Sequence, residues 1–225
     1  MKAIQRRFRS AARWARVLVV LASLTVAGGC NRGGGSAAPA LLVETADPVT
    51  VNGKAVHVLP SAPLSLAAGD LLEAGPKGLA RLLYPDGSRF LLMPRGNDSG
   101  SLEVTPRALS AAPVVVKLVR GVLAFLVPKD RTVKDKYELR ALNTVTTVEG
   151  TAGRIFSSAT EDRVALEHGS VSVAAGAAVT RINGLQEAVW TRAANLFSVL
   201  TYDPNARDEA VYYAAPGFVP VEQNF

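Results

Sequence analysis

Few side chains in this sequence are of the types that do chemistry, and their spacing matches no familiar catalytic motif. The 225 residues contain one cysteine, Cys30, and two histidines, His57 and His168, so no closely spaced ligand pair suggests a zinc site. The serine in Gly96-Asn97-Asp98-Ser99-Gly100 stands one place later than a nucleophile elbow requires. We therefore expect no catalytic residue, no cofactor and no metal. A hydrolase stays as an alternative, because carboxylates that meet only in the fold leave no motif.

Cys30 stands where a short apolar stretch meets a glycine-rich tract. Residues 1–16 carry six basic and no acidic side chains, and residues 17–29 are uncharged. The apolar run is shorter than the ~20 residues of a membrane-spanning helix, so it fits a secretory signal peptide better. The run Asn31-Arg32-Gly33-Gly34-Gly35-Ser36 that follows has the composition of a flexible tether.

The segment Val26-Ala27-Gly28-Gly29-Cys30 resembles a bacterial lipobox, although Ala27 stands where lipoboxes prefer leucine. The resemblance implies cleavage before Cys30 and a diacylglycerol on its thiol. It also implies the outer membrane rather than the inner, because Asn31 follows the cysteine. We expect a protein anchored by lipid on the periplasmic side of the cell envelope. Ordinary signal-peptide cleavage and an uncleaved anchor remain as alternatives.

The charge of the chain changes once its first residues are set aside. The whole sequence has 25 Lys and Arg against 19 Asp and Glu, a formal charge of +6. Six of the 25 bases lie in residues 1–29, which leaves 19 bases against 19 acids in the remainder. Proteins that bind nucleic acid present a basic surface. We therefore expect no nucleic-acid partner.

Short apolar runs separated by glycine turns predict an all-β domain. Many of the runs are rich in β-branched residues or alternate polar with apolar, which is typical of strands with one buried face. The clearest hairpin joins residues 79–84 to residues 89–93. Strands at a spacing of about ten residues predict a sandwich, a barrel-like form or a short β-solenoid. Five pairs suit the positive φ of tight hairpin turns: Asn52-Gly53, Asp86-Gly87, Arg120-Gly121, His168-Gly169 and Asn183-Gly184.

Several landmarks, in order, resemble the FecR-type domain of bacterial envelope proteins over about residues 50–190. They are a Gly-Asp segment at 66–75, a small-residue strand with an Asp-Gly-Ser turn at 78–88, a strand after Gly121, the step Gly150-Thr151, and a valine-rich hairpin at 164–173. Leu142-Asn143 departs from the family, which often has Thr-Pro ahead of the Gly-Thr step. The resemblance implies a FecR-like sandwich or short β-solenoid of many short strands.

The turn residues of these landmarks have structural explanations. Asp86 and Gly87 suit a turn in which a short carboxylate accepts backbone N–H bonds. Gly150, next to Thr151, and Gly153 are expected to mark a bulge or a close crossing of strands.

The chain divides into four predicted segments: a signal peptide at 1–29, a Gly/Ala-rich tether at 30–40, the all-β domain at 41–190, and an aromatic-rich extension at 191–225. The extension is expected to be small and irregular or helical, and residues 190–200 fit either a short helix or a last strand. Trp190, Tyr212 and Tyr213 belong to a group of aromatic residues that either packs on the β domain or contacts a partner.

FecR-type regulators of transcription carry a cytoplasmic anti-sigma segment ahead of a membrane helix. Here at most sixteen residues precede the apolar run, so we expect no direct control of a sigma factor. The leading hypothesis is a membrane-tethered, non-enzymatic binding or scaffold module for an envelope protein or a cell-wall glycan. One alternative is a component of an iron-uptake or envelope-stress signalling relay that acts through a separate membrane partner. The other is an envelope hydrolase.

Overall fold

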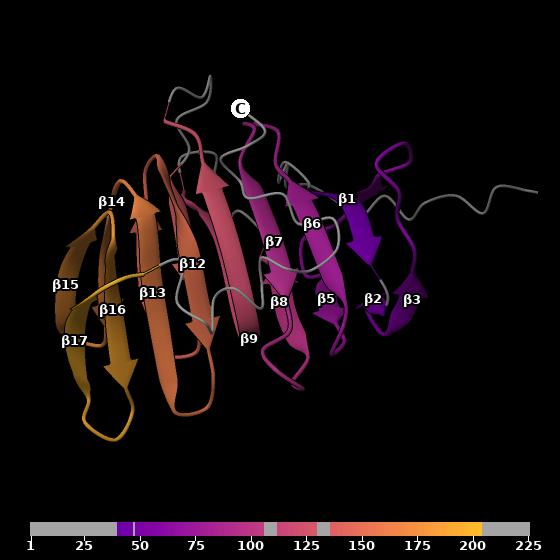
Figure 1. Cartoon of the computed structure of the whole chain (residues 1–225). Coiled ribbons are helices and arrows are strands. Elements are labelled where there is room, and N and C mark those ends of the chain that lie inside the picture. Colours follow the sequence, from indigo (N-terminus) through magenta and orange to yellow (C-terminus); the bar gives the residue numbers. More distant parts are fainter. Residues whose placement is uncertain (1–39, 47, 106–111, 130–135, 204–225) are drawn as a thin grey trace, which may run out of the picture. The chain divides into compact units, whose positions relative to one another are not determined.

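The computed structural model describes residues 40–46, 48–105, 112–129 and 136–203. The regular secondary structure in these ranges consists of β-strands, which confirms the predicted all-β class (Figure 1). Sheet A contains, in spatial order, β4 (Leu64–Ser65), β1 (Leu41–Ala46), β6 (Leu79–Leu83), β7 (Arg89–Met93), the second half of β9 (Val114–Val127), β12 (Thr151–Ser157), β13 (Glu161–His168), β16 (Gln186–Thr191) and β17 (Leu196–Thr201). Sheet B contains β3 (Lys54–Val56), β2 (Val49–Val51), β5 (Leu71–Ala74), β8 (Gly100–Val104), the first half of β9, β10 (Tyr137–Arg140), β11 (Val145–Val148), β14 (Ser170–Ala175) and β15 (Ala178–Asn183). Within the described residues, only β9 and β10 pair in parallel.

Strand β9 passes from one sheet to the other at Gly121. Its residues up to Arg120 pair with β8 and β10, and those from Gly121 onward pair with β7 and β12. The φ of Gly121 is 98°, and a Cβ there would lie 2.7 Å from both the Gly100 Cα and the Met93 carbonyl oxygen. The positive φ expected at this position is confirmed. The prediction of a hairpin turn at Arg120-Gly121 is wrong, because the glycine lets one continuous strand pass from sheet B to sheet A.

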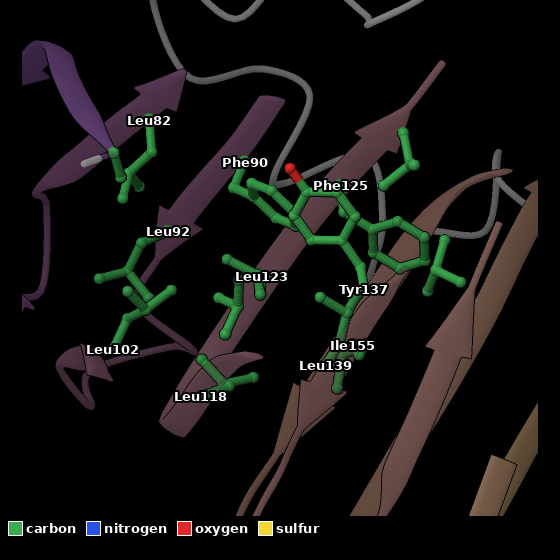
Figure 2. Packing of buried hydrophobic residues seen from close by; sticks show 14 of the residues in the cluster. Leu82, Phe90, Leu92, Leu102, Leu118, Leu123, Phe125, Tyr137, Leu139 and Ile155 are labelled. Carbon is green, nitrogen blue, oxygen red and sulfur yellow. The ribbon is translucent and has the colours of Figure 1, made fainter. Parts of the chain in front are cut away.

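An apolar core fills the space between the two sheets. Alternate residues of most strands point into it, such as Phe125 of β9 and Tyr137 of β10 (Figure 2). The rings of Tyr84, Phe90 and Tyr137 meet there with centroids 5.2 to 5.7 Å apart, in edge or tilted contacts. Such contacts add ~0.5–1.5 kcal/mol to the stabilisation from burial, so this aromatic group helps to hold sheet A on sheet B.

Sheet A is apolar on its outer face as well. A second buried cluster lies there, and Val122 belongs to it while the next residue, Leu123, belongs to the core. Strands buried on both faces read as continuous apolar runs, which explains the unbroken apolar sequence of residues 90–93 in β7 and of the second half of β9. The members of the outer cluster are Leu91, Met93, Val122, Ala124, Phe156, Ala165 and Tyr202, with Leu79 packed against them.

Two of the five predicted glycine turns close hairpins. Asn52-Gly53 joins β2 to β3, and Asp86-Gly87 joins β6 to β7, as predicted. His168-Gly169 leads from β13 in sheet A to β14 in sheet B, and Asn183-Gly184 leads from β15 back to β16 in sheet A. The valine-rich hairpin predicted at 164–173 is therefore wrong, because its two halves lie in different sheets.

The end of the described chain is a strand and not a helix. β17 pairs with β16 from Leu196 to Thr201, so sheet A continues past residue 190, where the extension was expected to begin. Among the described residues, no helix is long and apolar enough to cross a bilayer.

Candidate functional site

Three of the predicted site residues, Cys30, Tyr212 and Tyr213, lie outside the described residues. Trp190 lies on β16, where only 7% of it is exposed. Its indole Nε1 has no hydrogen-bond partner among the described residues. The Trp190 side chain is thus packed into the β domain and adds nothing to an exposed aromatic surface.

Asp86 and Gly87 form the turn between β6 and β7. The Asp86 carboxylate accepts hydrogen bonds from the Ser88 N–H at 2.9 Å and the Ser88 hydroxyl at 3.0 Å, and the Tyr137 hydroxyl donates to it at 2.9 Å. Gly87 has a φ of 84°. Burial raises the pKa of the Tyr137 phenol well above its usual range, so it stays protonated and donates. This carboxylate therefore ties a turn of sheet A to a strand of sheet B.

Gly150 and Thr151 lie at the start of β12, where the chain enters sheet A. Gly150 has a φ of 86°, and a Cβ there would lie 3.0 Å from the Lys129 Cα. The Thr151 hydroxyl donates to the Ser170 carbonyl oxygen at 3.3 Å. A register shift between Ala152 and Gly153 marks the bulge that was expected near these glycines. The contacts are those of a close crossing of chain segments.

A buried carboxylate that sequence reasoning missed is Asp162, which is 1% exposed. It accepts hydrogen bonds from the Ser157 hydroxyl at 2.8 Å, the Asn143 N–H at 2.7 Å and the Thr144 hydroxyl at 3.3 Å. Burial raises its pKa, and these hydrogen bonds act in the opposite direction. Asp162 thereby joins the loop between β10 and β11 to the hairpin of β12 and β13. No spacing rule links these residues in sequence, so only the fold shows the cluster.

Two ion pairs lie on the outer face of sheet A beside the second apolar cluster. Arg154 is 2% exposed and pairs with Glu167 at 3.0 Å. Arg163 pairs with Glu187 at 2.6 Å, and its guanidinium lies 5.1 Å from the centre of the Phe156 ring. Cations placed over an aromatic face are attracted to it. The outer face thus combines apolar side chains with charges that are matched locally.

Exposed apolar side chains are frequent on and between the last described strands, β15 to β17. Five of the nine exposed large apolar residues of the described chain lie between residues 179 and 200. Strand register directs Val179 to the outer face of sheet B and Leu196 and Leu200 to the outer face of sheet A, so these side chains lie around the end of the two sheets. Apolar side chains that are exposed near one another mark candidate interaction sites. We call these five residues the apolar end; they are Val179 (67% exposed), Leu185 (53%), Leu196 (63%), Val199 (44%) and Leu200 (51%).

The described titratable side chains were compared with the ligand sets that metal ions need. Among the described residues, no group of three or more His, Cys, Asp or Glu side chains is placed to hold one.

Comparisons with known proteins find a likeness of fold. No family model matches the chain, and no curated protein matches it. Two crystal structures, each described as "a putative anti-sigma factor" from Parabacteroides distasonis, superpose with TM-scores of 0.51 and 0.50 at 16% and 17% identity. Each match covers 59% of this chain, and 60% and 61% of the two other chains. The chain therefore corresponds to less than two thirds of the length of these neighbours.

Proposed function

We propose that this chain is a non-enzymatic binding module of the cell envelope, tethered to a membrane through lipid on Cys30, and that it works by contact with another protein. The observation that carries the proposal is the apolar end. Exposure of these aliphatic side chains is unfavourable by ~25 cal/mol for each Å² left in water. A partner that covers them recovers that free energy.

A protein fits this surface better than a glycan does. Sugars are held by stacking on exposed aromatic rings and by polar groups, whereas the five residues of the apolar end are aliphatic. Of the two aromatic residues on β16 and β17, Trp190 is buried and Phe197 is partly buried against the core. Protein interfaces, in contrast, have apolar centres with polar rims.

The test is site-specific photo-crosslinking in living cells from Val179 and Leu185, with Lys54 as the control position. Lys54 is also exposed, but it lies on β3, which is the outermost strand at the end of sheet B opposite to β15. We expect one identified envelope protein to be captured from both Val179 and Leu185 and not from Lys54. Equal capture from Lys54, or no shared product, would refute contact at the apolar end.

A second candidate function is a component of a signalling relay that acts through a separate membrane partner. Its support is the shared fold with two structures described as anti-sigma factors, which agrees with the FecR-type landmarks in the sequence. Deletion of the gene and a Leu185→Glu substitution should then change the same set of transcripts. If neither alters transcription while the crosslinked partner persists, the scaffold function is favoured over the relay.

A further inference from the structure

The outermost strands of the two sheets differ in how well they are protected against pairing. Natural sheets protect an edge strand by making it short or by placing charges or proline on it. β4 has two residues and follows Pro63, β3 has three residues and begins with Lys54, and β15 carries Arg181. β17 is six residues long, and its sequence Leu-Phe-Ser-Val-Leu-Thr contains no charge and no proline. The unprotected edge among the described strands is therefore that of β17.

The backbone of β17 directs every second residue to the open edge. The Tyr202 N–H donates to the Leu185 carbonyl oxygen at 2.9 Å, so the backbone of Tyr202 bonds toward the segment that leads into β16. Because hydrogen-bonded and non-hydrogen-bonded positions alternate in antiparallel ladders, Ser198 also bonds toward β16. Phe197 and Val199 consequently direct their N–H and C=O groups away from the sheet.

The sequence of β17 is nearly symmetric about Ser198, with Phe197 and Val199 on either side and Leu196 and Leu200 beyond them. We propose that β17 pairs antiparallel with β17 of a second copy of this chain, about a two-fold axis at Ser198. This inference rests on the proposed contact function and names the occupant of the β17 part of the apolar end.

The proposed register satisfies both the side chains and the backbone. Leu196 faces Leu200 of the second copy on the outer face of sheet A, and Phe197 faces Val199 on the inner side. The two symmetry-related Phe197–Val199 pairs supply about four backbone hydrogen bonds. Symmetric registers one step to either side, centred on Phe197 or on Val199, would place a leucine opposite Ser198. A two-fold pairing is also a closed interface, so it satisfies the edge of β17 in both copies and adds no further copies to form a fibre.

Cysteine crosslinking tests the register directly. In a chain that carries Cys30→Ser, and so lacks other thiols, Ser198→Cys places two thiols opposite one another at a non-hydrogen-bonded pair. The Cα atoms of such pairs are about 4.5 Å apart, within the range of a disulfide. We expect mild oxidation to convert this variant to a covalent dimer. The matched control is Ser172→Cys, an exposed serine on β14 with a neighbour on each side, which should stay monomeric on denaturing gels.

Light scattering on the full chain with Cys30→Ser supplies a second readout. We expect twice the chain mass, reduced to the monomer mass by Leu200→Lys but not by Leu142→Lys, which changes a leucine of similar exposure (55% against 51%) on a loop. A monomer mass across a concentration series, together with no Ser198→Cys dimer, overturns the inference. If photo-crosslinking from Leu185 still captures another envelope protein in that case, the contact function survives without the dimer; if it captures none, both fail.

Discussion

Replacing Gly121 by alanine should destabilise the protein more than the same change at another glycine of positive φ that has more room around it. Gly121 and Gly53 both have positive φ, 98° and 75°, so alanine at either pays a conformational cost of ~1 kcal/mol. A Cβ at Gly53 meets nothing within 4 Å, whereas one at Gly121 would lie 2.7 Å from backbone atoms of two other residues. Overpacking of this kind costs ~1–3 kcal/mol in addition.

We therefore expect Gly121→Ala to lower the free energy of unfolding by about 2–4 kcal/mol, and Gly53→Ala by about 1 kcal/mol. For a domain of this size 1 kcal/mol moves Tm by about 2–4 °C, so the two variants should separate by several degrees. The assay is urea unfolding followed by circular dichroism, with Tm as a second readout. Equal losses in the two variants would refute the reasoning, because the close approach at the sheet crossing would then cost nothing.

Three further predictions concern the buried carboxylate, the ion pairs and the tether. Burial raises the pKa of Asp162, so its carboxyl group binds a proton more tightly in the folded protein than in the unfolded chain. The stabilisation that comes from this proton is fully present below the unfolded pKa of ~3.9, and it is lost as pH rises through the folded pKa. The stability of the natural protein relative to Asp162→Asn should therefore increase as pH falls through that folded pKa, measured by unfolding at a series of pH values. Double-mutant cycles should give a coupling of about 1–3 kcal/mol for Arg154–Glu167, whose arginine is buried. The coupling should be at most about 0.5 kcal/mol for Lys136–Glu149, an exposed pair of nearly equal length, 3.1 Å against 3.0 Å. Cys30→Ser should move the protein from the membrane fraction to the soluble fraction in detergent-free fractionation.

Each of these predictions has a result that counts against it. A stability difference for Asp162→Asn that is constant with pH would mean that this carboxyl titrates alike in the folded and unfolded protein. Equal coupling in the two ion pairs would mean that burial does not strengthen Arg154–Glu167. Membrane retention of the Cys30→Ser protein would argue for an uncleaved anchor, and Ser36→Ala in the same tether serves as its control.

The sequence predicted the β class and most strand positions, because apolar alternation and glycine turns are local signals. It could not tell a hairpin from a crossing between sheets. Asn52-Gly53 and His168-Gly169 look alike in sequence, and both contain a glycine with positive φ. The first closes a hairpin and the second carries the chain to the opposite sheet. What differs is the position of the following strand, which is decided by packing of the whole core.

The candidate surfaces were hidden from sequence reasoning for a similar reason. Leu200 and Leu123 are both leucines in apolar runs, yet one is half exposed and the other is fully buried. Exposure depends on which strand ends a sheet, and strand order is a long-range property. Asp162 likewise meets its partners from a distant loop only through the fold. The signal that could have indicated β17 is the uncharged run at 195–202, which is unusual for an exposed strand.

Membership of one strand in both layers has a consequence for how the domain comes apart. If β9 detaches, each layer loses a central member at once, so neither can melt while the other persists. Heat or denaturant should therefore give a single sharp transition whichever layer a spectroscopic probe reports on. A single transition also removes the half-open intermediates that proteases would otherwise attack.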